Sequence, residues 1–237
     1  MNATFPLTRW SQVLAIQKDG EERAEKALAD LCQDYWSPLY AFIRRAGYRP
    51  EDAEDLTQGF FTFLIEKEVL SRADQRRGKL RSFLLTSLKN YMSDEWDKRM
   101  ALKRGGTAEI VPIDGPVAEA GYQLEIASRE AGPDEVFDRQ WALIVMRRVF
   151  DEVREGYESK GQGELFDTLH PFLAPQGRSK NYRNAGERLG LQGSGVRVAL
   201  FRMRQRYAEV LRKHLLDTVA SEDEVAEEIN SLIVALR

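Results

Sequence analysis

Apolar residues recur every three or four positions along most of the chain, which is the spacing of amphipathic helices. In the first half, this pattern predicts helices over residues 8–17, 21–46, 50–66 and 80–100. Pro38 either interrupts the second of these helices or opens a new one after Ser37. The four segments are long enough to bury a shared apolar core.

Residues 105–132 lose this period and carry several Gly and Pro residues together with many acids. The stretch exceeds the roughly 12–15 residues usual for a loop inside a compact domain, so we expect a linker at a domain boundary. Helical spacing then returns over residues 133–153, 165–173, 181–189, 194–217 and 225–236. A piece at 110–113 is the one candidate strand, and the sequence therefore predicts an all-α fold.

The helix expected over 194–217 has one apolar stripe with arginines on both sides. The stripe has spacings of 4, 3, 4, 3 and 4 and consists of Val196, Leu200, Met203, Tyr207, Val210 and His214. Arg197, Phe201 and Arg204 fall on one flank, and Arg202 and Arg206 fall on the other. A short helix and a tight turn with glycine at 190 and 193 precede it, which is the outline of a helix-turn-helix. Many helical hairpins share this outline, so the motif alone leaves the function open.

Charge is distributed unevenly along a chain whose net charge is −3. Residues 76–104 hold nine cations against three acids, and residues 178–213 hold ten against two. Between them, residues 109–138 hold eight acids against one arginine. One basic block alone would indicate a solvated helix face, but two blocks inside helical motifs favour a polyanion such as nucleic acid.

Several function classes find no support in the sequence. No apolar run approaches the roughly 18–20 residues that span a bilayer, and no secretory signal is expected at the start. The single cysteine, Cys32, excludes an intrachain disulfide and fits the cytoplasm. The two histidines, His170 and His214, are expected on helix surfaces or ends. With no metal-ligand cluster and no phosphate loop, we expect no enzyme, no cofactor and no metal.

Three segments occur in an order that identifies a family resemblance. They are "AEDLTQGFF" from Ala53, "RSFLLTSLKNYMSDEWDKR" from Arg81 and "YRNAGERLGLQGSGVRVALFRMRQRY" from Tyr182. The chain resembles bacterial RNA polymerase sigma factors of the extracytoplasmic-function (ECF) type. The resemblance implies a sigma region-two-like helical bundle at 1–104, a linker at 105–133 and a region-four-like helix-turn-helix domain at 134–216. An acidic helical extension at 217–237 completes the expected division.

The resemblance also implies partners and contact residues. The partners are core RNA polymerase, through its β′ clamp and β flap, and promoter DNA. Residues facing the clamp would be Asp52, Asp55, Gln58 and Phe61. Residues engaging the minus-ten element would be Lys89, Asn90, Tyr91, Asp94, Trp96, Lys98 and Arg99. Residues engaging the minus-thirty-five element would be Arg178, Lys180, Arg183, Arg197, Phe201, Arg202, Arg204 and Arg206. Among these, Trp96 is the better stacking candidate, because Tyr91 lies on the packed face, and Arg197 and Arg202 are the first choices in the second domain.

The chain also departs from the family pattern. Gly59 stands where many relatives have glutamate, Asp97 where many have a cation, and Gln192 with Gly193 where a hydroxyl cap and an acid are usual. Gly195 falls in the first turn of the basic helix, which could then start late or fray.

Alternatives to a sigma factor remain open. They are a helix-turn-helix regulator that works without polymerase and a helical protein-interaction adaptor. An anti-sigma factor, or the acidic extension folding onto the basic second domain, would be the regulator of a sigma factor.

Overall fold

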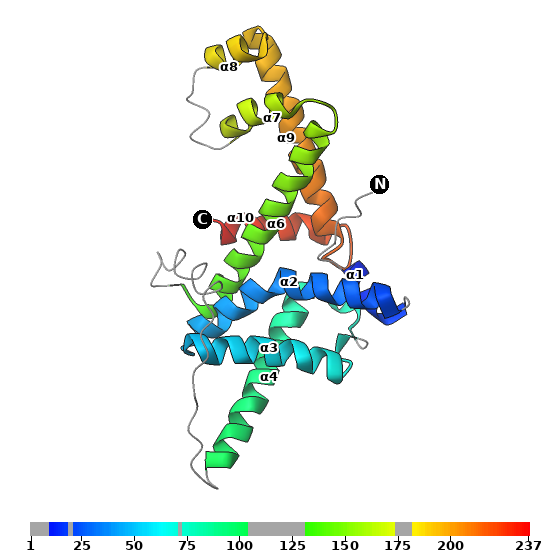
Figure 1. Ribbon diagram of the computed structural model, residues 1–237, viewed down its shortest axis with the longest axis vertical. Helices are drawn as coiled ribbons and strands as arrows, with labels where there is room; N and C mark the ends of the chain where they lie inside the picture. Colours follow the sequence, from blue (N-terminus) through cyan, green and yellow to red (C-terminus); the bar gives the residue numbers. More distant parts are fainter. Residues whose placement is uncertain (1–9, 19–20, 71–72, 104–130, 174–181) are drawn as a thin grey trace. The chain divides into compact units, whose positions relative to one another are not determined.

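A computed structural model describes residues 10–18, 21–70, 73–103, 131–173 and 182–237 of the chain (Figure 1). Within these ranges the chain forms helices and their connections without a strand, which confirms the predicted all-α class. The candidate strand at 110–113 and most of the expected linker lie outside the described residues. Within the same ranges, no helix combines the length and the apolar character needed to cross a membrane.

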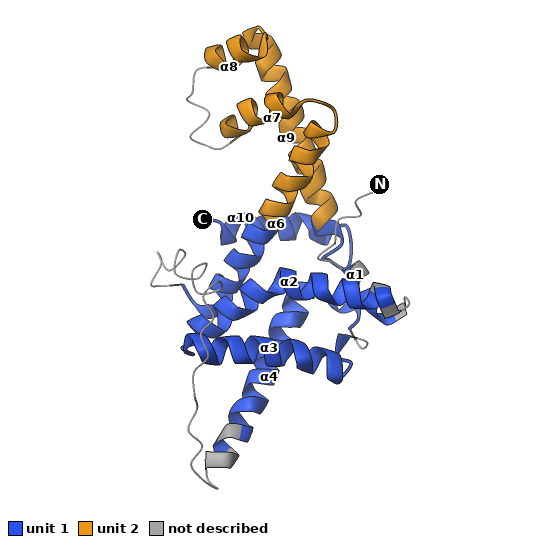
Figure 2. Ribbon diagram, viewed as in Figure 1, with its two compact units in different colours: residues 1–144, 215–237 blue, residues 145–214 orange. Residues whose placement is uncertain are grey.

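The chain divides into two compact units, drawn in different colours in Figure 2. Unit 1 contains residues 1–144 and 215–237, and unit 2 contains residues 145–214. The chain passes between the units twice, inside α6 (Pro133–Glu158) and inside α9 (Gly193–Leu216). Unit 2 therefore begins at residue 145, inside α6, and residues 215–237 belong to unit 1, whereas the sequence-based division has its second domain at 134–216 and a separate extension at 217–237.

Unit 1 is built mainly from three long helices. They are α2 (Glu21–Arg45), α3 (Pro50–Glu66) and α4 (Leu80–Lys103), with α1 (Trp10–Lys18) packed on α2 and the turn η2 (Gln75–Arg77) before α4. The fully buried side chains fall at the predicted helical spacing and include Leu31, Tyr35, Leu39, Ile43, Phe60, Leu64, Leu80, Leu84 and Leu88. Pro38 lies inside α2 and neither interrupts it nor starts a new helix. Burial of the apolar face offsets the one backbone hydrogen bond that a proline cannot donate.

The C-terminal helix α10 (Glu224–Ala235) joins unit 1 through a buried charge cluster. The Glu228 carboxylate is 0% exposed and accepts from Arg81 Nε at 2.6 Å and from Lys79 Nζ at 2.7 Å. Arg81 also pairs with Asp138 of α6, and its guanidinium carbon lies 4.7 Å from the centre of the Trp141 ring. In this structure the extension belongs to unit 1, where its one buried acid, Glu228, binds Arg81 and Lys79.

The environment of this cluster shifts the pKa of its two carboxyl groups in opposite directions. Burial raises the pKa of Glu228, but the hydrogen bonds and charges of Arg81 and Lys79 outweigh burial and leave it below its ordinary value. Burial also raises the pKa of Asp138. The charge of Arg81 lowers it by less, so the pKa of Asp138 stays above its ordinary value. Glu228 is thus held ionised by two cations, while Asp138 is the weaker partner of Arg81.

Unit 2 is a helical hairpin closed by short helices. It contains the second part of α6, α7 (Gly163–Leu169), the turn η3 (His170–Phe172), α8 (Tyr182–Leu189) and most of α9. Its buried side chains include Val149, Val153, Phe166 and Leu169. Glu152 of α6 ties the far end of α9 to α6, because it accepts from Lys213 Nζ at 2.9 Å and lies 2.8 Å from His214 Nε2.

Of the two histidines of unit 2, His170 is half-buried and His214 is buried. The ring centre of His170 lies 4.8 Å from Phe150, edge-on, and 5.3 Å from Phe166, stacked. Burial lowers the pKa of His170. His214 is buried at the end of the predicted stripe. Both histidines lie at helix ends, as one of the two expected placements has it: His170 follows the last residue of α7 and His214 lies in the last turn of α9.

Candidate nucleic-acid interface

In unit 2, a short helix, a tight turn and a long helix follow one another in the order that the sequence predicts for a helix-turn-helix. Helix α8 ends at Leu189, Gly190 follows at φ +64°, and α9 begins at Gly193. The Leu191 N–H donates to the Gly186 carbonyl at 2.8 Å, and a Cβ on Gly186 would come within 2.6 Å of the Leu191 oxygen. A glycine at 190 permits the left-handed turn, and a glycine at 186 permits the close approach of the turn to α8.

Helix α9 buries the stripe that its sequence predicts. Val196, Leu200, Met203 and Val210 are buried, Tyr207 is half-buried, and the ring centre of Tyr207 lies 6.1 Å from that of His170. The helix includes Gly195 in its first turn, so it does not start late. The buried stripe fixes which face of α9 points outward.

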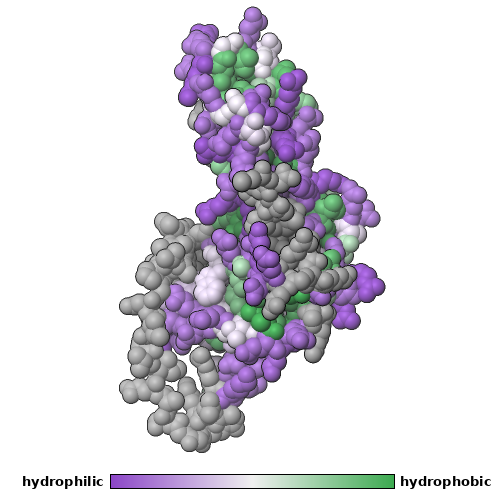
Figure 3. Space-filling view, turned by 45° about the vertical axis from the view of Figure 1, so that its right-hand side comes forward, coloured by the Kyte–Doolittle hydropathy of each residue, from purple (hydrophilic) through white to green (hydrophobic). Residues whose placement is uncertain are grey.

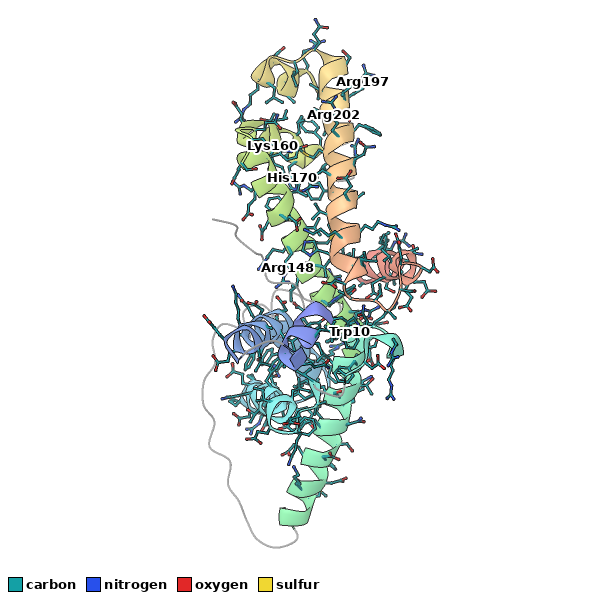
Figure 4. All side chains as sticks on the ribbon, turned by 90° about the vertical axis from the view of Figure 1, so that its right-hand side faces the viewer. Trp10, Arg148, Lys160, His170, Arg197 and Arg202 are labelled. Carbon is teal, nitrogen blue, oxygen red and sulfur yellow. The ribbon has the colours of Figure 1, made fainter. Side chains whose placement is uncertain are left out.

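The outward face of α9 carries the arginines. Arg197, Arg202, Arg204 and Arg206 are exposed, and Figure 4 labels Arg197 and Arg202 on this helix. Arg206 lies 3.5 Å from Glu209, and Arg204 donates to the Phe172 carbonyl at 3.4 Å. Arg197, Arg202 and Arg204 form no ion pair with the residues that the structure describes. These three cations are therefore available to an external anion.

Four further predicted residues belong to the same region of the sequence. Arg183 is exposed on α8, and Phe201 is 58% exposed on α9. Arg178 and Lys180 lie outside the described residues. Unit 2 thus presents an aromatic ring and several cations from α8 and α9.

Sequence reasoning missed apolar surface beside these cations. Val198 is 50% exposed and borders an open groove of about 700 Å³ that Leu165, Leu191 and Arg202 also line. Figure 3 shows hydrophobic surface surrounded by hydrophilic surface at the end of unit 2 where α8 and the start of α9 lie. The signal was present in the sequence, because Val198 and Phe201 are three apart on the side opposite the stripe.

In unit 1, most cations of the first basic block whose side chains the structure describes are paired with acids. Arg76 pairs with Asp74 at 2.9 Å, and Lys79 and Arg81 belong to the Glu228 cluster. Lys89 lies 2.6 Å from Asp134, and Lys98 lies 2.7 Å from Glu95, whose hydrogen bond raises the pKa of Lys98. Asp134 and Asp138 come from the acidic stretch after the linker, which the sequence placed in another domain.

The residues expected at the minus-ten element differ in exposure along α4. Lys89, Asn90, Asp94 and Lys98 are exposed, and Trp96 is 57% exposed. Tyr91 is half-buried, with its ring centre 5.3 Å from that of Phe63 and 5.8 Å from that of Phe60. The side chain of Arg99 lies outside the described residues. An exposed indole can stack on a base, whereas the ring of Tyr91 packs against Phe60 and Phe63.

The absence of a side chain at Gly59 follows from the position of Tyr91. A Cβ at Gly59 would collide with the Tyr91 hydroxyl. Glycine at position 59, where many relatives have glutamate, therefore has a packing reason. The Tyr91 hydroxyl occupies the space on α3 that a larger side chain at position 59 would need.

The residues expected to face the polymerase clamp are on α3. Asp55 and Gln58 are exposed and border an open groove of about 470 Å³, whose other walls include Tyr91 and Lys98 of α4. Asp52 is half-buried and pairs with Arg49 at 3.1 Å. Phe61 is 5% exposed and stacks on Trp36 at 5.9 Å between ring centres, so the structure makes it a core residue. It cannot reach a partner from this position.

No metal-binding cluster is formed by His, Cys, Asp and Glu within the described parts of the chain. Comparison of the chain with protein-family models, with curated proteins and with solved structures finds no match. The two candidate nucleic-acid or protein-binding surfaces are α8 and α9 of unit 2 and the α3–α4 surface of unit 1.

Proposed function

We propose that this protein is an ECF-type sigma factor, a promoter-specificity subunit of bacterial RNA polymerase that acts in the cytoplasm. The observation that carries the proposal is α9, a helix with a buried apolar stripe and outward arginines that follows a short helix and a tight turn. In such a motif the second helix enters the major groove, and nearby cations bind phosphates.

The α3–α4 surface of unit 1 supports the second half of the proposal. A melted promoter strand requires aromatic faces for stacking and cations for its phosphates. Trp96 offers an exposed indole, and Lys98 lies two residues further along α4. The carboxylate of Asp55 and the amide of Gln58 suit a cationic partner helix, which is the role that the family resemblance assigns to them.

No covalent chemistry is assigned to this chain. The proposed work is done by binding energy: unit 2 holds duplex DNA, and unit 1 traps bases that leave the stack when the duplex opens. Core polymerase supplies the catalytic site for RNA synthesis.

Reconstitution with core polymerase tests the proposal. The full-length chain is expected to co-elute with core polymerase from a size-exclusion column. Replacing both Asp55 and Gln58 by Ala should weaken this association, and Glu227→Ala on the exposed face of α10 is the matched control. A chain that binds duplex DNA but never polymerase would instead be an independent regulator. A chain that binds neither would be an interaction adaptor.

A further inference from the structure

The outermost line of residues on α9 is uncharged. Ser194, Val198, Phe201 and Gln205 are all exposed and follow one another at spacings of 4, 3 and 4. At about 100° per residue, this line lies on the side of the helix opposite the buried stripe. We call these four residues the α9 ridge.

Arginines flank the α9 ridge on both sides. Arg197 and Arg204 lie on one side, and Arg202 and Arg206 lie on the other. A helix in the major groove has a phosphate backbone at each side and the base edges in front. The flanking guanidinium groups are therefore placed to bind the phosphates on either side of the major groove. The α9 ridge is placed to contact the base edges between them.

The chemistry of the ridge indicates which bases it fits. Val198 and Phe201 are 50% and 58% exposed, and apolar side chains in the major groove contact the 5-methyl group of thymine. The amide of Gln205 can pair with N6 and N7 of adenine, whereas guanine is recognised mainly by arginine or lysine. Both observations point to the same base pair.

We propose that the α9 ridge reads A·T base pairs in the major groove, with Val198 and Phe201 on thymine methyl groups and Gln205 on adenine. This inference rests on the duplex-binding part of the proposed function and assigns the specificity to the ridge. The flanking arginines then supply affinity that depends little on sequence.

The test uses the full-length chain and a duplex selected by it from a randomised pool. Each thymine of the selected duplex is replaced in turn by uracil, which removes only the 5-methyl group. Because one methyl group contributes about 0.8 kcal/mol, we expect about fourfold weaker binding at the contacted thymines. Replacement of the contacted adenine by 7-deazaadenine should weaken binding by the wild type but not by Gln205→Ala.

The variant Val198→Ala should bind thymine and uracil equally at one position and keep the discrimination at the others. Phe201→Ala provides a second, independent variant for the other thymine. The matched control is Val234→Ala, because Val234 is a 69% exposed valine on α10 of unit 1. This control should keep every thymine preference.

Two outcomes would overturn the inference, and they are distinguishable. If the chain binds a selected duplex and no uracil substitution weakens it, the ridge does not read methyl groups and the proposed function still stands. If no duplex is selected at any salt concentration, the DNA-binding role of unit 2 fails together with the inference.

Discussion

The two basic stretches of the chain carry similar formal charge and use it differently. In unit 1, acids far away in sequence pair with Lys79, Arg81 and Lys89. In unit 2, Arg197, Arg202 and Arg204 face outward without an ion pair among the described residues. Cations that are paired and buried hold a fold together, whereas exposed and unpaired ones can bind phosphate. We therefore expect unit 2 to be the main duplex-binding surface.

Breaking the buried pair that defines unit 1 should have the greatest consequence. Glu228→Gln leaves Arg81 and Lys79 without their central carboxylate, and the free energy of unfolding should fall by about 3–5 kcal/mol. Urea unfolding followed by tryptophan fluorescence measures this directly, because all four tryptophans lie in unit 1. Glu227→Gln, an exposed neighbour on the same helix, should change little; equal destabilisation by both variants would contradict the role of the cluster.

The next effect concerns the exposed cations of unit 2. Replacing Arg202 and Arg204 by Ala should weaken duplex binding and lower the slope of log affinity against log salt by about one for each phosphate that is no longer bound. Fluorescence anisotropy over a range of salt concentrations gives the slope. Arg76→Ala, which removes a paired cation of unit 1, is the control. If the Arg202 and Arg204 double variant kept the wild-type salt slope and Arg76→Ala lowered it, the duplex would be bound by unit 1 rather than unit 2.

Two glycines of the helix-turn-helix should respond in opposite directions. Gly186→Ala brings a methyl group against the Leu191 carbonyl, and such overpacking costs about 1–3 kcal/mol. Gly195→Ala places its Cβ 3.6 Å from Leu191 Cβ, an ordinary contact, and should stabilise α9 by about 0.5–1 kcal/mol. Amide hydrogen exchange in unit 2 measures both, and destabilisation by Gly195→Ala would contradict the described packing.

The loss of unit 1 stability at low pH should be the smallest of these effects. The pKa of Glu228 is lowered, so its contribution is fully present above the ordinary glutamate pKa of 4.5 and is lost as the pH falls through the lower folded pKa. The pKa of Asp138 is raised, which acts in the opposite direction and offsets part of the effect. Urea midpoints at a series of pH values below 5 should fall less steeply for Glu228→Gln than for the wild type. If the urea midpoints of the two proteins fell equally steeply with pH, Glu228 would not be the carboxyl group responsible for the acid dependence.

Local periodicity predicted most of the helices and the buried side of α9, because the positions of Val196, Leu200 and Met203 depend only on the helical repeat. It did not predict where α10 packs, because Arg81 and Glu228 are 147 residues apart and no local rule joins them. The same limit explains Phe61, which shares its helix with Asp55 and Gln58 but stacks on Trp36 of another helix. Net charge along the sequence likewise could not distinguish paired cations from free ones.

The proposed role of α9 in directing polymerase to promoters is tested by transcription from a promoter library with core polymerase. With the wild-type chain, we expect transcripts that start at a defined set of sites. With Arg197 and Arg202 both replaced by Ala, these transcripts should disappear, while Arg76→Ala keeps them. Start sites that are the same with the double variant as with the wild type would contradict this role of α9.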